Sequence, residues 1–285
     1  MINDKNEVAL AVLSSPGDMN SQVVGGDSRV TFSNPAASQN NVNYPTSGLK
    51  LGHFGSKDNA DPYNDVRKHF DEIIPEAQRN GVPYFPFSTY GDVHEGTHGL
   101  NAIIRNLYGQ GTGTDNAFYL LDGNYVIVKE PPGVTMTQAA GYVPSDMTGL
   151  TSYQTYLISQ SGSWNNQPLN IMDEFTAYTN SEIYKNKWGG NDNVVNNAPD
   201  FTVYSTALGL AIEQNNPQYW NSEEGTKFKQ VLALSIERAN YANPGSMKSG
   251  YPSNIMTSQD QKYVWLKQFL QRNYPESWIR QNFGQ

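Results

Sequence analysis

The sequence predicts an α+β fold with an N-terminal strand and loop region, a small sheet and a mostly helical C-terminal lobe. Two observations predict it. Short runs of alternating or β-branched residues occur in the first half of the chain, where they are mixed with helical patterns. The second half carries almost only apolar residues with the period of a helix. Mixed strands and helices followed by helices alone indicate an α+β fold.

The composition is that of a folded chain. Its 285 residues are 37% hydrophobic, 12% aromatic and only 16% charged, whereas disordered chains combine few aromatic residues with high net charge. The net charge of −8 argues against general affinity for nucleic acid or an anionic membrane. No apolar run reaches the roughly 18 residues of a membrane span. The absence of cysteine excludes disulfides, Cys-ligated zinc and thiol catalysis.

The high content of neutral polar residues favours an extracellular protein. Asn, Tyr and Gly are abundant, lysine is scarce, and a cysteine-free chain is compatible with secretion from a bacterium. The apolar stretch near the N-terminus is flanked by acidic residues, so no signal-peptide pattern is present. We therefore expect a secreted protein on composition alone.

Residues 1–60 are predicted to form a strand and loop-rich N-terminal region. Strand-like runs at Glu7–Leu13, Arg29–Phe32 and Leu49–Phe54 are separated by turn-forming sequences. From Asp61 the period changes to that of a helix, which Asn80 and Gly81 end and which Pro75 should kink or restart. Its predicted apolar face is Val66, Phe70, Ile73, Ile74 and Ala77. Residues 61–285 are assigned to one domain that forms a compact unit with the N-terminal region.

A second helix is predicted from Asp92 to Tyr108, and the glycine-rich stretch that follows ends it. Its apolar stripe is Leu100, Ile103, Ile104 and Leu107. The sequences AFYLL and YVIVKE, joined by a DGN turn, then predict a β-hairpin. Residues 131–168 are predicted to be a long polar loop.

The C-terminal half is predicted to be helical. Asn170 is predicted to cap the first of these helices, and Ser258 with Gln261 predicts a capping box at the start of the last long one. Pro275 is expected to open a short terminal helix. The predicted long helices span residues 171–185, 204–215, 226–242 and 258–274.

Two of the four histidines lie in the string VHEGTHGLN of the second predicted helix, which forms an HExxH motif. Side chains at positions i and i+4 lie one above the other on a helix, so His94 and His98 can both reach one zinc ion at about 2.0–2.1 Å. Glu95 is rotated by about 100° around the helix axis. It can therefore act as general base towards the water that attacks a carbonyl group, rather than bind the metal.

A catalytic zinc needs a third protein ligand. His53 and His69 are poor candidates, because one lies in a strand-like segment and the other beside an apolar helix face. Ile104 stands where the metzincin pattern requires its third histidine, which excludes that class. Glu174 on the downstream helix is the preferred ligand. Tyr178, Ser181 and Glu182 share its helix face, and the alternative carboxylates are Glu182, Glu213 and Glu237.

The strings HEGTHGLNAIIRN and DEFTAYTNSE together resemble the gluzincin-type HExxH zinc metallopeptidases, most closely the lethal-factor-like group. The resemblance implies a zincin-like active-site helix, a helical lobe around the site and a peptide substrate lying along an edge strand. It also implies that His94, His98 and Glu174 bind Zn²⁺ and that Glu95 is the catalytic base. The sequence departs from the group in the long gap from His98 to Glu174 and in lacking a tyrosine just before the third ligand. Tyr178 is the first candidate for the oxyanion donor, with Tyr156 and Tyr153 as alternatives.

The sequence therefore predicts a secreted, zinc-dependent endopeptidase that acts on a protein or peptide through a metal-activated water. It predicts no nucleic-acid partner. One alternative is a secreted binding or effector module, whose zinc site is structural or vestigial and whose aromatic surface engages a protein or glycan. Another is an enzyme that hydrolyses a non-peptide amide.

Overall fold

The computed structural model describes residues 45–55, 60–90, 92–111, 113–191 and 195–284. It confirms a mixed α+β fold with a small three-stranded antiparallel sheet. The strands are β1 (Gly52–His53), β2 (Asp115–Tyr119) and β3 (Asn124–Lys129), in the order β1-β3-β2. The predicted strands at 7–13 and 29–32 lie outside the described residues.

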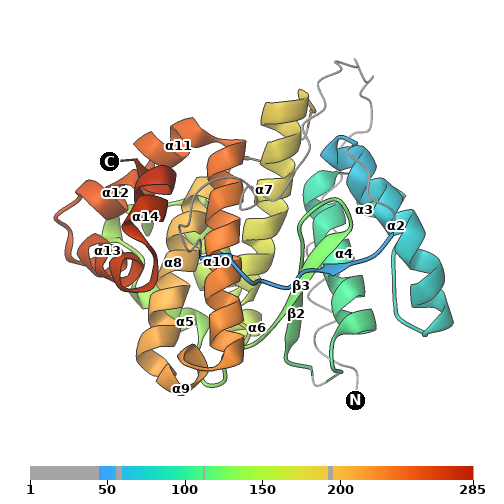
Figure 1. The fold of residues 1–285 in the computed structure, drawn as a ribbon, viewed down its shortest axis with the longest axis horizontal. Coiled ribbons are helices and arrows are strands. Elements are labelled where there is room, and N and C mark those ends of the chain that lie inside the picture. The colour runs from blue at the N-terminus through green and yellow to red at the C-terminus, as the bar shows by residue number, and fades with distance from the viewer. Residues whose placement is uncertain (1–44, 56–59, 91, 112, 192–194, 285) are drawn as a thin grey trace.

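Helices surround the sheet (Figure 1). A π-helical segment, Tyr153–Ser159, and a 3₁₀ turn, Ser145–Met147, lie between the hairpin and the C-terminal helices. The α-helices are α2 (Pro62–Arg79), α3 (Phe87–Tyr90), α4 (Val93–Tyr108), α5 (Met136–Gly141), α6 (Ser161–Trp164), α7 (Asn170–Trp188), α8 (Ala198–Asn215), α9 (Pro217–Trp220), α10 (Glu223–Ala242), α11 (Pro244–Ser249), α12 (Tyr251–Thr257), α13 (Gln261–Asn273) and α14 (Glu276–Phe283).

The sheet separates two hydrophobic cores. Because successive side chains of a strand point to opposite faces, Phe118 and Leu120 enter the larger core, whereas Ala117, Tyr119 and Leu121 enter the smaller one. The larger core also holds the apolar residues of α8, α10, α13 and α14, and the smaller one holds those of α2 and α4.

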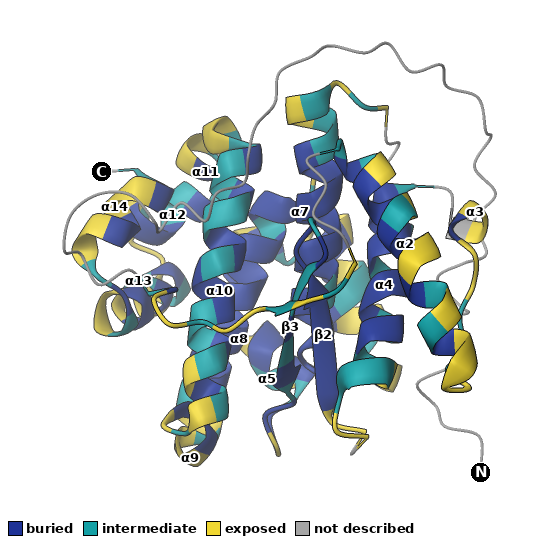
Figure 2. Ribbon diagram, turned by 45° about the vertical axis from the view of Figure 1, so that its right-hand side comes forward, coloured by how far each residue is buried: buried dark blue, intermediate teal, exposed yellow. Residues whose placement is uncertain are grey.

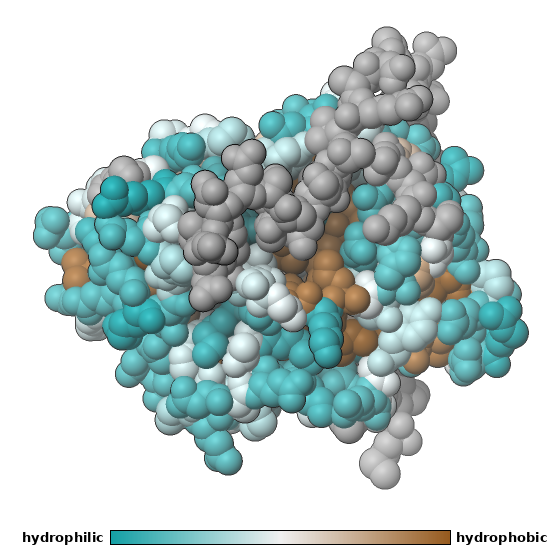
Figure 3. Space-filling view, in the orientation of Figure 1, coloured by the Kyte–Doolittle hydropathy of each residue, from teal (hydrophilic) through white to brown (hydrophobic). Residues whose placement is uncertain are grey.

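Figure 2 shows α7 and α8 as mostly buried elements. The face seen in Figure 3 is largely hydrophilic, with a hydrophobic patch right of its centre.

Both helices predicted before the hairpin are confirmed. The side chain of Asp61 caps α2 by accepting the Asn64 N–H at 3.0 Å, and α2 continues through Pro75 without restarting. Asp92 caps α4 in the same way, accepting the Glu95 N–H at 2.7 Å. The predicted hairpin is also confirmed, because β2 pairs with β3 from Asp115–Lys129 to Tyr119–Tyr125.

Gly96 allows α4 to pack closely against its neighbours. A Cβ atom at Gly96 would lie only 2.7 Å from both the Phe87 ring and the Val66 side chain. The absence of a side chain therefore brings the first turn of α4 against α2 and α3, and this fixes the segment that carries the HExxH motif.

The prediction of a long polar loop at 131–168 is wrong. This region contains α5, the 3₁₀ turn, the π-helix and α6. Thr135 and Gln138 form a reciprocal capping box at the start of α5, with the Gln138 N–H donated to Thr135 Oγ1 at 3.2 Å. The loop was predicted because this region shows no helical period of apolar residues. Its helices are too short to produce one.

The C-terminal helices are confirmed, but two predicted caps are wrong. The Leu169 N–H at the start of α7 is bound by the Glu130 carboxylate at 3.2 Å, and Asn170 is already helical. Asp260 caps α13 by accepting the Lys262 N–H at 2.9 Å, so Ser258 and Gln261 form no capping box. Within the described residues, no helix is both long and apolar enough to cross a membrane.

Candidate metal centre

The first two turns of α4 present two imidazoles side by side. His94 and His98 are four residues apart, and their Nε2 atoms lie 3.2 Å from each other. His94 is buried, and the side chain of His98 is 16% exposed. The two rings meet edge to face, with centroids 4.7 Å apart. Both Nε2 atoms can therefore bind the same ion from different directions.

Helix α7 brings a carboxylate to the same point. Glu174 Oε2 lies 3.5 Å from His94 Nε2 and 3.5 Å from His98 Nε2. This buried oxygen has no hydrogen-bond partner within normal distance, although buried carboxylate oxygens are normally satisfied. The three side chains form a buried group that could hold a metal ion.

Asp173, the residue before Glu174, binds the other nitrogen of His98. Its Oδ2 lies 3.0 Å from His98 Nδ1, and its Oδ1 accepts a hydrogen bond from the Asn101 side chain. Asn101 Oδ1 in turn accepts the Tyr119 N–H of β2 at 2.6 Å. The His98 ring is therefore oriented through two side chains that connect it to the sheet.

The charges of the group are coupled. Burial lowers the pKa of His98, but the Asp173 and Glu174 carboxylates outweigh burial and raise this pKa well above its usual value. Burial raises the pKa of Glu174, but His98 and His94 outweigh it and bring the pKa down to about 2. At neutral pH these shifts make Glu174 an anion and His98 a cation, so binding of a metal ion would have to displace a proton from His98.

Glu95 lies beside this group on α4 without binding either histidine. Its backbone N–H is held by Asp92, and the buried oxygen Oε2 of its side chain has no hydrogen-bond partner. An unpaired carboxylate oxygen in a desolvated position is free to accept a proton from a ligand of the site.

Of the three candidate tyrosines, Tyr178 and Tyr156 lie at the site and Tyr153 does not contact them. The Tyr178 ring packs on His94 with a centroid distance of 4.3 Å. Its hydroxyl lies 2.7 Å from that of Tyr156. Tyr153 instead packs its ring edge to face on Tyr204. Burial, followed by the charge of Glu174, raises the pKa of both Tyr156 and Tyr178, so both hydroxyls are protonated at neutral pH.

The alternative carboxylates are engaged elsewhere. Glu182 accepts the Ala198 N–H at 3.1 Å, and Glu213 pairs with Arg272 at 2.5 Å. Glu237 accepts the indole N–H of Trp278 at 2.6 Å. Among the acidic residues considered as third ligand, only Glu174 joins the two histidines in the described structure.

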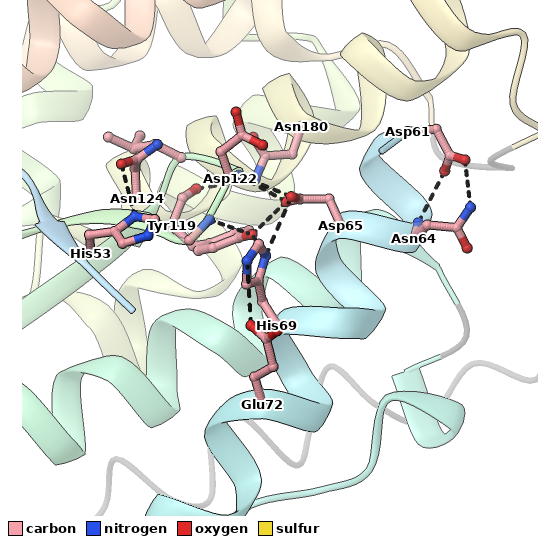
Figure 4. Close-up of polar contacts among 12 residues, drawn as sticks. His53, Asp61, Asn64, Asp65, His69, Glu72, Tyr119, Asp122, Asn124 and Asn180 are labelled. Carbon is pink, nitrogen blue, oxygen red and sulfur yellow. Dashed lines mark hydrogen bonds and ion pairs between the residues drawn. The ribbon is translucent and has the colours of Figure 1, made fainter. Parts of the chain in front are cut away.

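The remaining histidines make structural contacts. His69 is fully buried, and its Nδ1 lies 2.6 Å from the Tyr119 hydroxyl and 3.4 Å from Asp65 (Figure 4). His53 is exposed and contacts the Asn124 side chain at 3.3 Å. His69 is thus packed inside the protein, and it is not part of the group formed by His94, His98 and Glu174.

A buried amide joins the two helices that carry the candidate ligands. Asn180 of α7 donates to Thr97 Oγ1 of α4 and to the Tyr119 carbonyl of β2, both at 3.1 Å. Arg238 of α10 binds the Asn180 oxygen at 2.5 Å. Because Asn101 and Asn180 occupy the N–H and C=O of Tyr119, this end of the β2 edge is closed to a substrate strand.

Two residues of the site, Asp173 and Asn101, were not assigned a role from the sequence, and both orient His98. Tyr156, predicted as an alternative oxyanion donor, contacts the hydroxyl of Tyr178. The helical spacing of His98 and Asn101, three positions apart on one face, was an available signal for Asn101. Comparisons of this chain with protein-family models, with curated proteins and with solved structures found no match.

Proposed function

We propose that this protein is a zinc-dependent endopeptidase of gluzincin type that cleaves the peptide bonds of a protein substrate. The observation that carries the proposal is the meeting of His94, His98 and Glu174 at one buried point, next to Glu95, whose buried oxygen Oε2 has no hydrogen-bond partner. The packing of α4 against β2 supports a zincin-like arrangement of helix and sheet.

The spacing of the donor atoms fits zinc. Ligand bonds of about 2.0–2.1 Å in a tetrahedron place neighbouring ligand atoms about 3.3–3.4 Å apart. The three distances between donor atoms here are 3.2, 3.5 and 3.5 Å. Two imidazole nitrogens and one carboxylate oxygen are also the donor set of many catalytic zinc sites, which keep a fourth position for water or substrate.

Each residue of the site has a defined task in this proposal. A bound zinc ion would lower the pKa of water to about 7 and polarise the scissile carbonyl. His94 and His98 bind through Nε2, and Asp173 keeps the His98 proton on Nδ1. Glu95 takes a proton from the attacking water through its carboxylate and passes it to the leaving amine. The Tyr178 hydroxyl donates a hydrogen bond to the carbonyl oxygen as negative charge develops there.

The decisive experiment compares the full chain with its Glu95→Gln variant, in metal content and in casein cleavage. The wild type should carry one zinc per chain and cleave casein, and a chelator should stop the cleavage. Glu95→Gln should retain the zinc and lose the cleavage, because the amide cannot take the proton. Zinc without cleavage in the wild type would favour a binding module with a structural site, and absence of zinc would contradict the proposal.

A further inference from the structure

The hydroxyl pair of Tyr156 and Tyr178 is a polar contact between the π-helical segment and α7, and it lies against the candidate ligand His94. Tyr178 faces His94, and Tyr156 approaches from the segment Tyr153–Ser159 with its hydroxyl 2.7 Å away. The π character of this segment is visible in the bond from the Gln160 N–H to the Thr155 carbonyl, five residues back. Single π turns within helices are frequent at functional sites.

Aromatic rings pack against the Tyr156 side chain. Its ring lies parallel to Trp164, at a centroid distance of 6.4 Å, and meets the Phe201 ring edge to face at 5.2 Å. In the described structure, the only hydrogen-bond partner of the Tyr156 hydroxyl is Tyr178. Either hydroxyl of the pair can donate; with Tyr156 as the donor, Tyr178 accepts and keeps its own proton for another partner.

Tyr178 is then the acceptor of the hydrogen bond from Tyr156, at 2.7 Å. A hydroxyl has two acceptor lone pairs and one proton. With Tyr156 on one of the lone pairs, the proton of Tyr178 points away from Tyr156. The ring itself cannot swing, since it is held between Phe201, at 5.2 Å, and His94.

We infer that Tyr156 is a positioning residue that fixes the Tyr178 hydroxyl with its proton directed at the substrate carbonyl oxygen. Tyr178 is the donor and Tyr156 acts only through it. This inference rests on the proposed peptidase function. It assigns the oxyanion donor to one of the two tyrosines at the site and gives the π-helical segment a function.

The test is a double-mutant cycle with the zinc-loaded full chain and a peptide that the wild type cleaves. Tyr178→Phe should lower kcat about 100-fold, the usual loss for one oxyanion donor. Tyr156→Phe should lower kcat about tenfold, because Tyr178 remains but is less well oriented, a loss typical of a residue that orients a catalytic group. Neither variant should change KM more than about twofold, because the hydrogen bond forms in the transition state. The double variant should be no slower than Tyr178→Phe alone.

Tyr153→Phe is the matched control. It removes a hydroxyl from the same π-helical segment, and that tyrosine packs on Tyr204 rather than on Tyr178. Its kcat should equal that of the wild type. Zinc content and thermal stability are measured for every variant, so that a loss of metal or of folding is separated from a loss of orientation.

Four results would overturn the inference while leaving the peptidase function intact. The first three are a wild-type kcat in Tyr156→Phe, a loss confined to KM, and losses that multiply in the double variant. The fourth is a larger loss in Tyr156→Phe than in Tyr178→Phe, which would make Tyr156 the donor. If the wild type cleaves no peptide, the proposed function itself fails, and the inference fails with it.

Discussion

Asp173 and His98 face each other across the contact between α7 and α4, with Oδ2 3.0 Å from Nδ1. The opposite nitrogen of the same ring, Nε2, faces Glu174 at 3.5 Å. The carboxylates of two consecutive residues, Asp173 and Glu174, thus lie at the two ring nitrogens of His98. A carboxylate on the far nitrogen fixes the tautomer and makes the ring a stronger metal ligand.

The first prediction concerns this contact. Asp173→Ala should weaken zinc binding by about 10–100-fold, the usual effect of removing a residue that orients a ligand. Zinc affinity is measured by competition with a chromophoric chelator. Asp71→Ala, on the exposed side of α2, is the control and should bind zinc as the wild type does. Equal affinity in Asp173→Ala would show that His98 does not depend on Asp173.

The second prediction separates the third ligand from its alternatives. Glu174→Ala should deplete the protein of zinc, because only two ligands remain. Glu213→Ala should retain full zinc, since Glu213 binds Arg272 and Asn273 instead. Elemental analysis of the two purified variants is sufficient. Full occupancy in Glu174→Ala would place the third ligand elsewhere.

The third prediction concerns the packing of α4. Gly96→Ala should lower the free energy of unfolding by up to about 2 kcal/mol, because overpacking usually costs about 1–3 kcal/mol and alanine returns part of this. The new methyl group would press on Phe87 and Val66, which outweighs the roughly 1 kcal/mol that alanine contributes to a helix. Denaturant unfolding measures the difference. Gly141→Ala, at the end of α5 with open space around its Cβ, should be neutral or stabilising.

The fourth prediction is a pH dependence of stability. Burial raises the pKa of Glu182 to about 8, and the Asp200 carboxylate adds to this, whereas the Ala198 N–H and Lys185 oppose it. A folded pKa above the unfolded one means that the native state binds more protons between pH 4.5 and 8. The contribution of Glu182 to stability is therefore complete below pH 4.5 and is lost as the pH rises to 8.

The variant Glu182→Gln should not show this decrease of stability with rising pH. The amide keeps an oxygen for the Ala198 N–H and cannot ionise. Relative to the variant, the wild type should lose on the order of 3 kcal/mol of unfolding free energy between pH 5 and 8. Urea unfolding at several pH values measures it. If the free energy of unfolding changed with pH in the same way in both proteins, ionisation of Glu182 would not destabilise the fold.

The parts of the site that follow from local geometry could be predicted from the sequence. The i, i+4 spacing places His94 and His98 together wherever the segment is helical, and the capping residue Asp92 fixes where that helix begins. Glu174 could be proposed because a catalytic zinc requires a third ligand. Asp173 could not, because its reach to His98 depends on the antiparallel packing of α7 on α4.

Long-range contacts also explain the errors in the fold. Asn170 is a good capping residue, but Glu130 from the end of β3 takes the N–H at the start of α7. The helices between 131 and 168 are too short to show a period, although the pair Thr135 and Gln138 carried a local signal for α5. Tertiary structure decided the start of α7, and a local pattern carries no record of such a contact.

The amide of Asn180 ties α4, α7 and β2 together at a point where no solvent enters. The two helices that carry the candidate ligands are thus held in register by hydrogen bonds in which none of the candidate ligands takes part. Metal loading would then require no ordering of the chain, so its entropic cost would be small. Unlike a zinc finger, which folds only around its ion, this protein should load zinc with almost no change in heat capacity, since little apolar surface is buried in the process.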